Sequence, residues 1–293
     1  QARALDFSID RSSGIPYYVQ VRQALQEHLE TGTWKPGEQL PSEPELCRLF
    51  GVSRPVIRQA LNELTQRGLV IRAKGKGTFA APPKITEALV QKLTGFYQDM
   101  VEQGYTPTAR VLRQEAIPAG RQVAERLQIP VGTPVVVIER LRFVQDEPIQ
   151  LVTTYIPRDA CPALLEVDLT RRSLYAFLEA ECGIMIARGR RTVEAVAANE
   201  YEAEMLQVKK GAPLILLDSV SYLSDGTPIE YYHALHRGDR TRFEVELVRV
   251  REPGNRQALV EQHFDPQVVN QGVVLVPPSR SGRGKGKTAK TRT

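Results

Sequence analysis

An internal repeat in the second half of the chain restricts its possible folds more than any other feature. The segment Ala124–Phe143 aligns without gaps on Ala203–Tyr222, at an offset of 79 residues. With one extra residue in the turn, the alignment continues from Pro148–Asp159 to Pro228–Asp239. Each copy predicts a helix, a Gly-x-Pro turn and two strands joined by a polar turn. Two copies are too few for a solenoid. We expect an antiparallel sheet of two related halves, with helices on one side, that frames a central pocket.

The first part of the chain predicts three helices. Apolar residues recur at helical spacing over Tyr17–Thr31. A second helix begins at Ser42, where Glu45 completes a capping box. A short turn separates it from a third helix, which has Ser53 as its N-cap and Pro55 in its first turn. The second and third helices must therefore cross closely.

The pattern changes after the third helix. A short apolar strand precedes the basic, glycine-rich stretch Ala73–Gly77, and a second strand, Thr78–Ala80, follows it. Three helices followed by such a hairpin make a winged helix-turn-helix. A helix fits the DNA major groove, and arginines near its N-terminus can bind guanine. The candidate DNA-binding residues are Ser42, Ser53, Arg54, Arg58, Gln59, Arg72, Lys74, Gly75, Lys76 and Gly77.

The distribution of charge agrees with a polyanion partner for this part of the chain. The overall net charge is +5, but residues 1–84 carry +4, residues 85–278 carry −5 and residues 279–293 carry +6. The stretch Arg48–Lys84 has eight basic residues and one acid. Double-stranded DNA is the expected partner. The basic tail fits either a solvated, structureless segment or added nonspecific affinity for DNA.

The motifs of the first domain resemble those of the GntR family of bacterial regulators. The matching pieces are the turn around Trp34 and Pro36, then LPSE, GVSR, IRQAL and GKGTF, in this order. The resemblance implies a homodimer on a palindromic operator, with Arg54 and Arg58 reading bases and the wing glycines at the minor groove. Pro44 stands where many relatives carry a DNA-contacting arginine, so operator preference is expected to differ.

The second domain resembles the UTRA effector domain of the HutC subfamily, which has a chorismate-lyase-like fold. The resemblance rests on Arg140–Arg142, Ser173–Tyr175, Pro228–Glu230 and Arg237–Arg240, among others. It implies a small-molecule effector. We expect Arg140 and Glu230 on paired strands of the two repeat halves, where both face one cavity and bind opposite ends of a small anionic or zwitterionic ligand. The candidate effector-binding residues are Thr94, Arg140, Ser173, Tyr175, Arg188, Glu230 and His236.

Two departures bear on the identity of the effector. Relatives that bind phosphorylated amino sugars often carry an acid where this chain has Val152, and an aromatic hydroxyl where it has His236. A sugar phosphate is therefore not favoured, and a more apolar or nitrogen-containing ligand fits better. The candidate residues also have structural alternatives. Arg140 could form an ion pair with Glu139 and Ser173 could serve only as a helix N-cap. Tyr175 could belong to the core, Glu230 could be exposed, and Arg237, Asp239 and Arg240 could form a charge cluster at a hairpin corner.

Composition agrees with an α+β protein of ordinary cores. The chain has 293 residues, 42% of them hydrophobic, and no apolar run approaches the ~18 residues of a membrane span. No secretory signal is evident at the N-terminus, so a cytoplasmic, nucleoid-associated protein without membrane contact is expected. Cys47, Cys161 and Cys182 are expected to be reduced packing residues. We expect no metal and no cofactor.

Together these patterns predict four parts. Residues 1–81 form the winged helix-turn-helix, 82–88 a linker, 89–252 the UTRA-like effector-binding and dimerisation domain, and 253–293 an extension with a disordered basic tail. The leading interpretation is a ligand-responsive transcription regulator, most often a repressor in such proteins. An architectural DNA-binding protein whose second domain only dimerises is the alternative. No catalytic constellation supports an enzyme.

Overall fold

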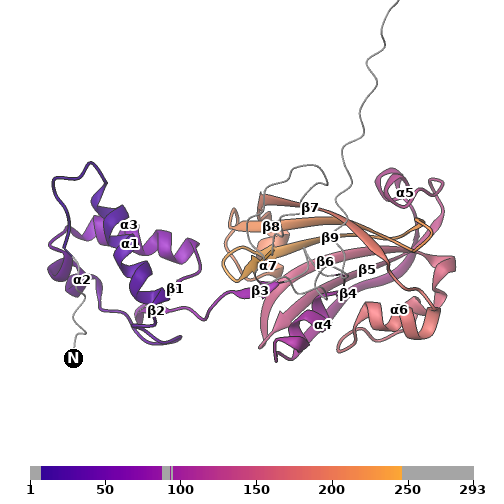
Figure 1. Ribbon diagram of the computed structural model, residues 1–293, viewed down its shortest axis with the longest axis horizontal. Helices are drawn as coiled ribbons and strands as arrows, with labels where there is room; N and C mark the ends of the chain where they lie inside the picture. Colours follow the sequence, from indigo (N-terminus) through magenta and orange to yellow (C-terminus); the bar gives the residue numbers. More distant parts are fainter. Residues whose placement is uncertain (1–7, 88–92, 94, 246–293) are drawn as a thin grey trace, which may run out of the picture. The chain divides into compact units, whose positions relative to one another are not determined.

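The computed structural model describes residues 8–87, 93 and 95–245. The predicted C-terminal extension, residues 253–293, lies outside the described residues. The first part consists of the helices α1 (Tyr17–Glu30), α2 (Glu43–Phe50) and α3 (Arg54–Gln66), followed by the strands β1 (Val70–Ala73) and β2 (Gly77–Ala80). These bounds confirm the expected winged helix-turn-helix (Figure 1).

Local sequence explains where these helices begin and end. The backbone N–H of Ser42 donates to the Glu45 carboxylate at 2.8 Å, as the capping box predicts. Gly51 ends α2 in the left-handed conformation, which glycine adopts without strain. Val21, Leu25, Leu46, Ile57 and Leu61, all fully buried, form the core shared by the three helices. Apolar burial of this kind is what holds a helical domain together.

The second part is built on a six-stranded antiparallel sheet. Its strands are β4 (Pro107–Pro118), β5 (Pro134–Val144), β6 (Glu147–Pro157), β7 (Arg188–Ala197), β8 (Pro213–Tyr222) and β9 (Pro228–Arg237). Their order across the sheet is β4-β5-β6-β9-β8-β7. This order is palindromic with respect to the repeat, because β6 and β9, the last strands of the two copies, pair at the centre.

The repeat is visible in the backbone as well as in the strand order. The helices α5 (Arg121–Leu127) and α7 (Glu200–Met205) precede the two strand pairs. Gln128 and Gln207, which are equivalent in the alignment, both have a φ of 54°. Gly132 and Gly211, also equivalent, have φ values of 88° and 80°. Residues that are equivalent in the sequence alignment therefore have the same backbone conformation at these turn positions.

The helices of the two repeat copies lie on one side of the sheet, as expected, but two further helices cover the other side. α5 and α7 pack on one face, against residues such as Val135 and Leu141 of β5. α4 (Gly95–Glu102) and α6 (Leu174–Cys182) pack on the other face, and Figure 1 shows α4 and α6 on the side opposite α5. The physical reason is that β5 and β6 are apolar on both faces, so both faces need a cover.

Two further expectations need correction. Residues Ile85–Glu87 of the predicted linker form a strand, β3, that pairs in parallel with β10 (Thr241–Phe243). Cys161 and Cys182, expected to be reduced, are joined by a disulfide with their Cα atoms 5.6 Å apart. The fold brings the short 3-10 helices over residues 158–165 against the end of α6, a proximity that a sequence separation of 21 residues concealed. Cys47 is free and partly buried, as expected.

Candidate functional site

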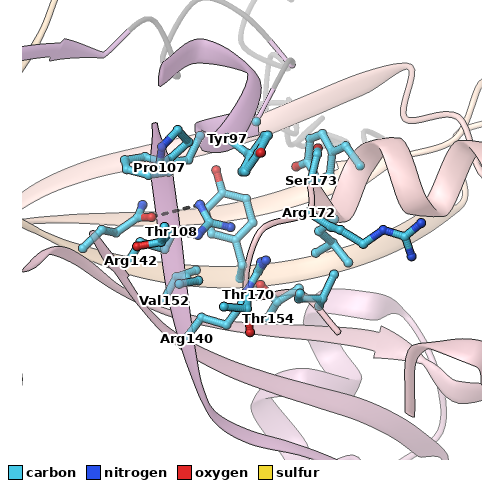
Figure 2. A pocket seen from close by; sticks show the side chains of 18 of the residues that line it. Tyr97, Pro107, Thr108, Arg140, Arg142, Val152, Thr154, Thr170, Arg172 and Ser173 are labelled. Atoms are coloured by element: carbon cyan, nitrogen blue, oxygen red, sulfur yellow. Dashed lines mark hydrogen bonds between the residues drawn. The ribbon is translucent and has the colours of Figure 1, made fainter. Parts of the chain in front are cut away.

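A cavity of about 640 Å³, including the open space at its mouth, lies against the face of the sheet that α4 and α6 cover. The residues that line it come from α4, α6, β4, β5, β6, β7 and β9, and from the segment before α6. Figure 2 shows Arg140, Val152 and Thr154 on one side of the cavity and Tyr97, Pro107 and Ser173 on the other. The two halves of the repeat thus share one pocket, as expected.

Arg140 dominates the electrostatics of this cavity. Its side chain is 2% exposed, and its Nε and Nη2 atoms have no hydrogen-bond partner among the described residues. Burial, followed by the charge of Arg142, lowers the pKa of Arg140 well below its ordinary range. The alternative of an ion pair with Glu139 is not observed, since Glu139 instead accepts a hydrogen bond from Tyr201 at 3.1 Å. Arg140 is therefore a desolvated cation that faces the cavity with unused donors.

Glu230 forms a polar cluster elsewhere in the same cavity. Its Oε2 accepts hydrogen bonds from the hydroxyls of Tyr175 and Ser221, each at 2.7 Å. It is 2% exposed, which excludes the alternative of an exposed strand residue. Burial raises the pKa of Glu230, against the opposing hydrogen bonds from Ser221 and Tyr175. Burial, followed by the charge of Glu230, raises the pKa of the Tyr175 phenol well above its ordinary range.

The strands that carry Arg140 and Glu230 were expected to pair with each other, but β6 lies between them. Val152 of β6 sits directly between Arg140 and Ala234 in the register, and it lines the cavity floor. An apolar side chain thus occupies the centre of the floor. Ser173 also lines the cavity, while its hydroxyl accepts a hydrogen bond from the Ala176 N–H at 3.2 Å. Its N-cap role and its place in the cavity coexist.

Three of the expected effector-binding residues do not appear in the cavity lining. His236 is fully buried behind it, between Gln150 and Glu87. Arg188 is exposed, with its guanidinium 4.3 Å from the centre of the Tyr222 ring. Alternation along β7 explains this second error, because Arg191, rather than Arg188, faces the cavity. Thr94 lies outside the described residues, although its neighbour Gly95 lines the cavity.

Sequence reasoning missed several polar residues of the lining, among them Arg142, Gln150 and Arg191. Arg142 could have been found from the alternation of strand side chains, because it follows Arg140 by two positions. Gln150 could have been found from the repeat, since it is the equivalent of Glu230. Arg191 belongs to β7, which lies outside the aligned segments, so no signal pointed to it.

The same equivalence relates two hydrogen bonds. Arg142 donates to Gln150 at 2.9 Å in the first copy, and Ser221, the equivalent of Arg142, donates to Glu230 at 2.7 Å in the second. The repeat thus places one bond of the same kind in each half of the cavity. One of the two carries a cation, and the other carries a carboxyl group.

The corner beyond β9 holds the charge cluster that was considered as an alternative for Arg237, Asp239 and Arg240. Arg237 pairs with Asp239 at 2.7 Å and with Glu147 at 3.0 Å, and Arg240 pairs with Glu147 at 2.8 Å. None of these side chains is among those that line the cavity. They tie β9 to the start of β6 and have a structural role.

A second candidate surface is the exposed side of α3 and the wing. Arg54, Arg58 and Gln59 project from α3 and are exposed. Glu43 of α2 pairs with Arg54 at 2.9 Å and with Arg72 of β1 at 2.6 Å. Burial opposes the ionisation of Glu43, but these arginines outweigh it, and the pKa of Glu43 is lowered. Glu43 therefore holds two of the candidate DNA-binding arginines in place.

The remaining candidates are on or beside the same elements. Ser42 and Ser53, the N-caps of α2 and α3, are exposed. Lys74, Gly75 and Lys76 form the exposed tip of the wing. Gly75 and Gly77 have φ values of 73° and 123°, which disfavour other residues. A Cβ atom at Gly77 would also overlap the side chain of Gln39, which donates to the Lys76 carbonyl at 2.9 Å.

These two sites define a class of protein: a DNA-binding regulator with a separate domain for a small-molecule effector. Residues 17–80 match the family described as bacterial regulatory proteins, gntR family, and residues 102–242 match the UTRA domain. The chain belongs to the GntR family and has the domain composition of its HutC-like members. It is a ligand-responsive transcription regulator rather than an enzyme.

Similar proteins agree with this assignment. The chain is 36% identical over 236 residues to the HTH-type transcriptional repressor NagR of Bacillus subtilis, covering 80% of this chain and 96% of that protein. It is 31% identical to the histidine utilization repressor of Pseudomonas putida, over 78% and 91% of the two chains. The crystal structure of PhnF from Mycobacterium smegmatis has a TM-score of 0.56 and 31% identity, covering 78% of this chain and 99% of that one. In the described residues, no helix is long and apolar enough to cross a membrane.

Proposed function

We propose that this protein is a cytoplasmic, nucleoid-associated repressor that binds a palindromic operator as a homodimer. It places α3 in the major groove, where Arg54 and Arg58 contact bases, and sets the wing lysines against phosphates. A small anionic or zwitterionic effector, bound in the cavity, controls its affinity for the operator. The names of the relatives, which include several repressors, support this reading.

One observation carries the effector part of the proposal: the buried Nε and Nη2 atoms of Arg140 have no hydrogen-bond partner among the described residues. A buried cation with unused donors costs the fold free energy. A carboxylate or phosphate group supplies two acceptor oxygens that match the planar fork of arginine. Arg142 and Arg191 add positive charge to the same lining. An anionic group of the effector therefore belongs at Arg140, while its hydrogen-bond donors face Glu230.

Operator selection from fragments of the source genome, followed by calorimetry on the full chain, tests this function. The ligand panel consists of inorganic phosphate, N-acetylglucosamine 6-phosphate and small carboxylates that carry an amino or imidazole group. We expect Arg140→Ala to abolish binding and Arg140→Lys to restore it poorly, because lysine lacks the planar fork. Arg113→Ala is the matched control, since Arg113 pairs with Glu115 on the exposed edge of β4.

The identity of the effector is open to the same measurement. Val152 on the cavity floor predicts weak binding, or none, of N-acetylglucosamine 6-phosphate, because the acid found there in sugar-phosphate-binding relatives is missing. Tight binding of that ligand with release of the operator would contradict this part of the proposal. Equal anion binding by wild type and Arg140→Ala would contradict the assignment of the cavity itself.

A further inference from the structure

A chain of hydrogen bonds leads from the cavity to β3. The Nη1 atom of Arg142 donates to Gln150 Oε1 at 2.9 Å. Gln150 Nε2 lies 2.8 Å from His236 Nε2, and His236 Nδ1 lies 2.9 Å from Glu87 Oε1. The side chains of His236 and Glu87 are both 0% exposed. Only the first two members of this chain, Arg142 and Gln150, line the cavity.

Arg142, the first residue of this series of hydrogen bonds, fixes which atom donates and which accepts in each of them. A guanidinium has donors and no acceptor, so the oxygen of Gln150 must face Arg142. The amide nitrogen of Gln150 is then left to donate to His236 Nε2. His236 must carry its proton on Nδ1, which donates to Glu87. Each group therefore has one assigned role, and loss of Arg142 removes the contact that fixes which end of the Gln150 amide faces His236.

Glu87, the last residue of this series of hydrogen bonds, lies in the strand that follows the DNA-binding domain. It is the last residue of β3, and it is in register with Phe243 of β10. The ring of Phe243 meets the His236 ring edge-on, with centroids 5.1 Å apart. Four residues separate β3 from the end of β2, and β3 pairs with β10, so it is the first element of the second domain. A contact that holds β3 also holds the end of the connection to the DNA-binding domain.

The charges at the two ends of this series of hydrogen bonds make it sensitive to an anion in the cavity. Arg142 and Glu87 are opposite charges that communicate through two neutral side chains. The Oε2 atom of Glu87 is buried with no partner among the described residues, so His236 is its main support there. Burial lowers the pKa of Arg142, and interactions with Tyr232, Tyr175, Glu230 and Glu87 oppose this effect. An anion beside Arg142 would compete for the same guanidinium donors and weaken the bond to Gln150.

We propose that Gln150, His236 and Glu87 act as a relay that transmits occupancy of the cavity to β3, and thus to the connection with the DNA-binding domain. The relay gives a role to His236, which does not line the cavity. The inference rests on the proposed function, because it takes the cavity as the effector site. Its decisive test nevertheless needs no effector.

Hydrogen–deuterium exchange of the β3 amides, measured on the full-length protein, provides that test. Arg142→Met removes the donor at the cavity end, and His236→Phe removes the middle of the relay but keeps an aromatic ring beside Phe243. Each single variant should speed exchange of the β3 amides several-fold. The double variant should be no faster than His236→Phe alone, because both changes break one chain. Independent, multiplicative effects would overturn the proposal.

A matched pair and a rescue variant separate the relay from a general loss of packing. Arg140→Met, on the same face of β5, should combine multiplicatively with His236→Phe, because Arg140 makes no hydrogen bond to Gln150 among those described. His236→Gln should restore slow exchange in part, since an amide can accept from Gln150 and donate to Glu87. If His236→Phe does not fold, the Nδ1 resonance of His236 in Arg142→Met decides the matter. An unchanged resonance would contradict the relay.

Inorganic phosphate at constant ionic strength separates this inference from the proposed function. Binding of phosphate to the wild type should change β3 exchange, and the change should vanish in His236→Phe. Phosphate bound through Arg140 without a response at β3 would overturn the relay and leave the effector cavity standing. Phosphate binding that does not depend on Arg140 would instead contradict the proposed function.

Discussion

Arg140 is a buried cation whose Nε and Nη2 atoms have no partner among the described residues. Replacing buried ion pairs with well-packed apolar side chains of similar volume is often neutral or stabilising by about 1–4 kcal/mol, and a buried cation without a partner has still less to lose. We expect Arg140→Met to raise the free energy of unfolding by an amount of that order and to abolish anion binding. Urea unfolding of both proteins, compared at equal slope, measures the effect. A less stable variant would mean that Arg140 has a stabilising partner in solution.

Glu230 gives a prediction that depends on pH. Its raised pKa means that the folded state holds the proton more tightly than the unfolded state. Wild-type stability should therefore fall as the pH rises from the ordinary pKa of a glutamate towards the raised one. Glu230→Gln, which keeps the shape but cannot ionise, should lack this loss and be the more stable protein at neutral pH. Thermal unfolding of the two proteins across pH 3–8 checks the sign, and a parallel dependence would refute it.

Which polar residues meet in the cavity was only partly predictable at this scale. Arg140, Tyr175 and Glu230 were predicted from the resemblance to a family, and the structure brings them to one cavity. His236 was assigned to the cavity because sequence cannot show depth: the same strand face continues past the cavity into a buried region. The order of the central strands, which separates Arg140 from Glu230 by β6, was likewise absent from the local pattern.

Among the elements, α3 has the most direct consequence for function. Arg58 is exposed on it and is not among the residues that Glu43 pairs with directly. Arg58→Ala should cost roughly 1–3 kcal/mol of specific binding and relax the preference at one base pair in each half-site. Competition binding with operator variants measures both quantities. Unchanged operator affinity in a folded variant would contradict the assignment of α3 as the recognition helix.

The wing should act through charge rather than sequence. Lys74 and Lys76 are exposed at its tip and are not paired in any ion pair described. Lys74→Ala and Lys76→Ala should weaken binding to all DNA sequences similarly and lower the salt slope by about one per lost phosphate contact in each subunit. Titrations at several salt concentrations, with operator and random DNA, check this. A change in sequence preference alone would identify the wing as a base reader.

The helices and strands themselves were more predictable from the sequence than the contacts between them. Caps and glycines located α2 and α3, and the repeat located α5, β5, α7 and β8, because these signals are local or can be compared between copies. The placement of helices on both faces, the pairing of β3 with β10 and the disulfide between Cys161 and Cys182 were not predictable. Each of these features depends on contacts between segments that are separated in sequence, and no local sequence pattern indicates such contacts.

For the whole molecule, the separation of the two sites predicts separable defects. The candidate DNA-binding residues lie between residues 42 and 77, and the cavity is lined by residues from 95 onwards. Arg140→Ala should therefore leave operator binding in the absence of effector nearly unchanged, while it abolishes the response to effector. Fluorescence anisotropy with labelled operator, with and without the ligand identified by calorimetry, measures both. Loss of operator binding in a folded Arg140→Ala protein would show that the cavity also supports the DNA-bound form.

The palindromic strand order has a consequence for how a ligand can be oriented. Two identical copies around the β6–β9 pair would present the same groups twice, and a ligand could enter in either of two equivalent directions. The copies have diverged at equivalent positions: Arg142 and Gln150 in one correspond to Ser221 and Glu230 in the other. Sequence divergence between the copies has thus made the two ends of the cavity chemically different: one end carries a guanidinium group, and the other carries a carboxyl group. A ligand with one anionic end and one hydrogen-bond-donating end therefore has a preferred orientation in this cavity, and the charges of the lining disfavour the reversed orientation.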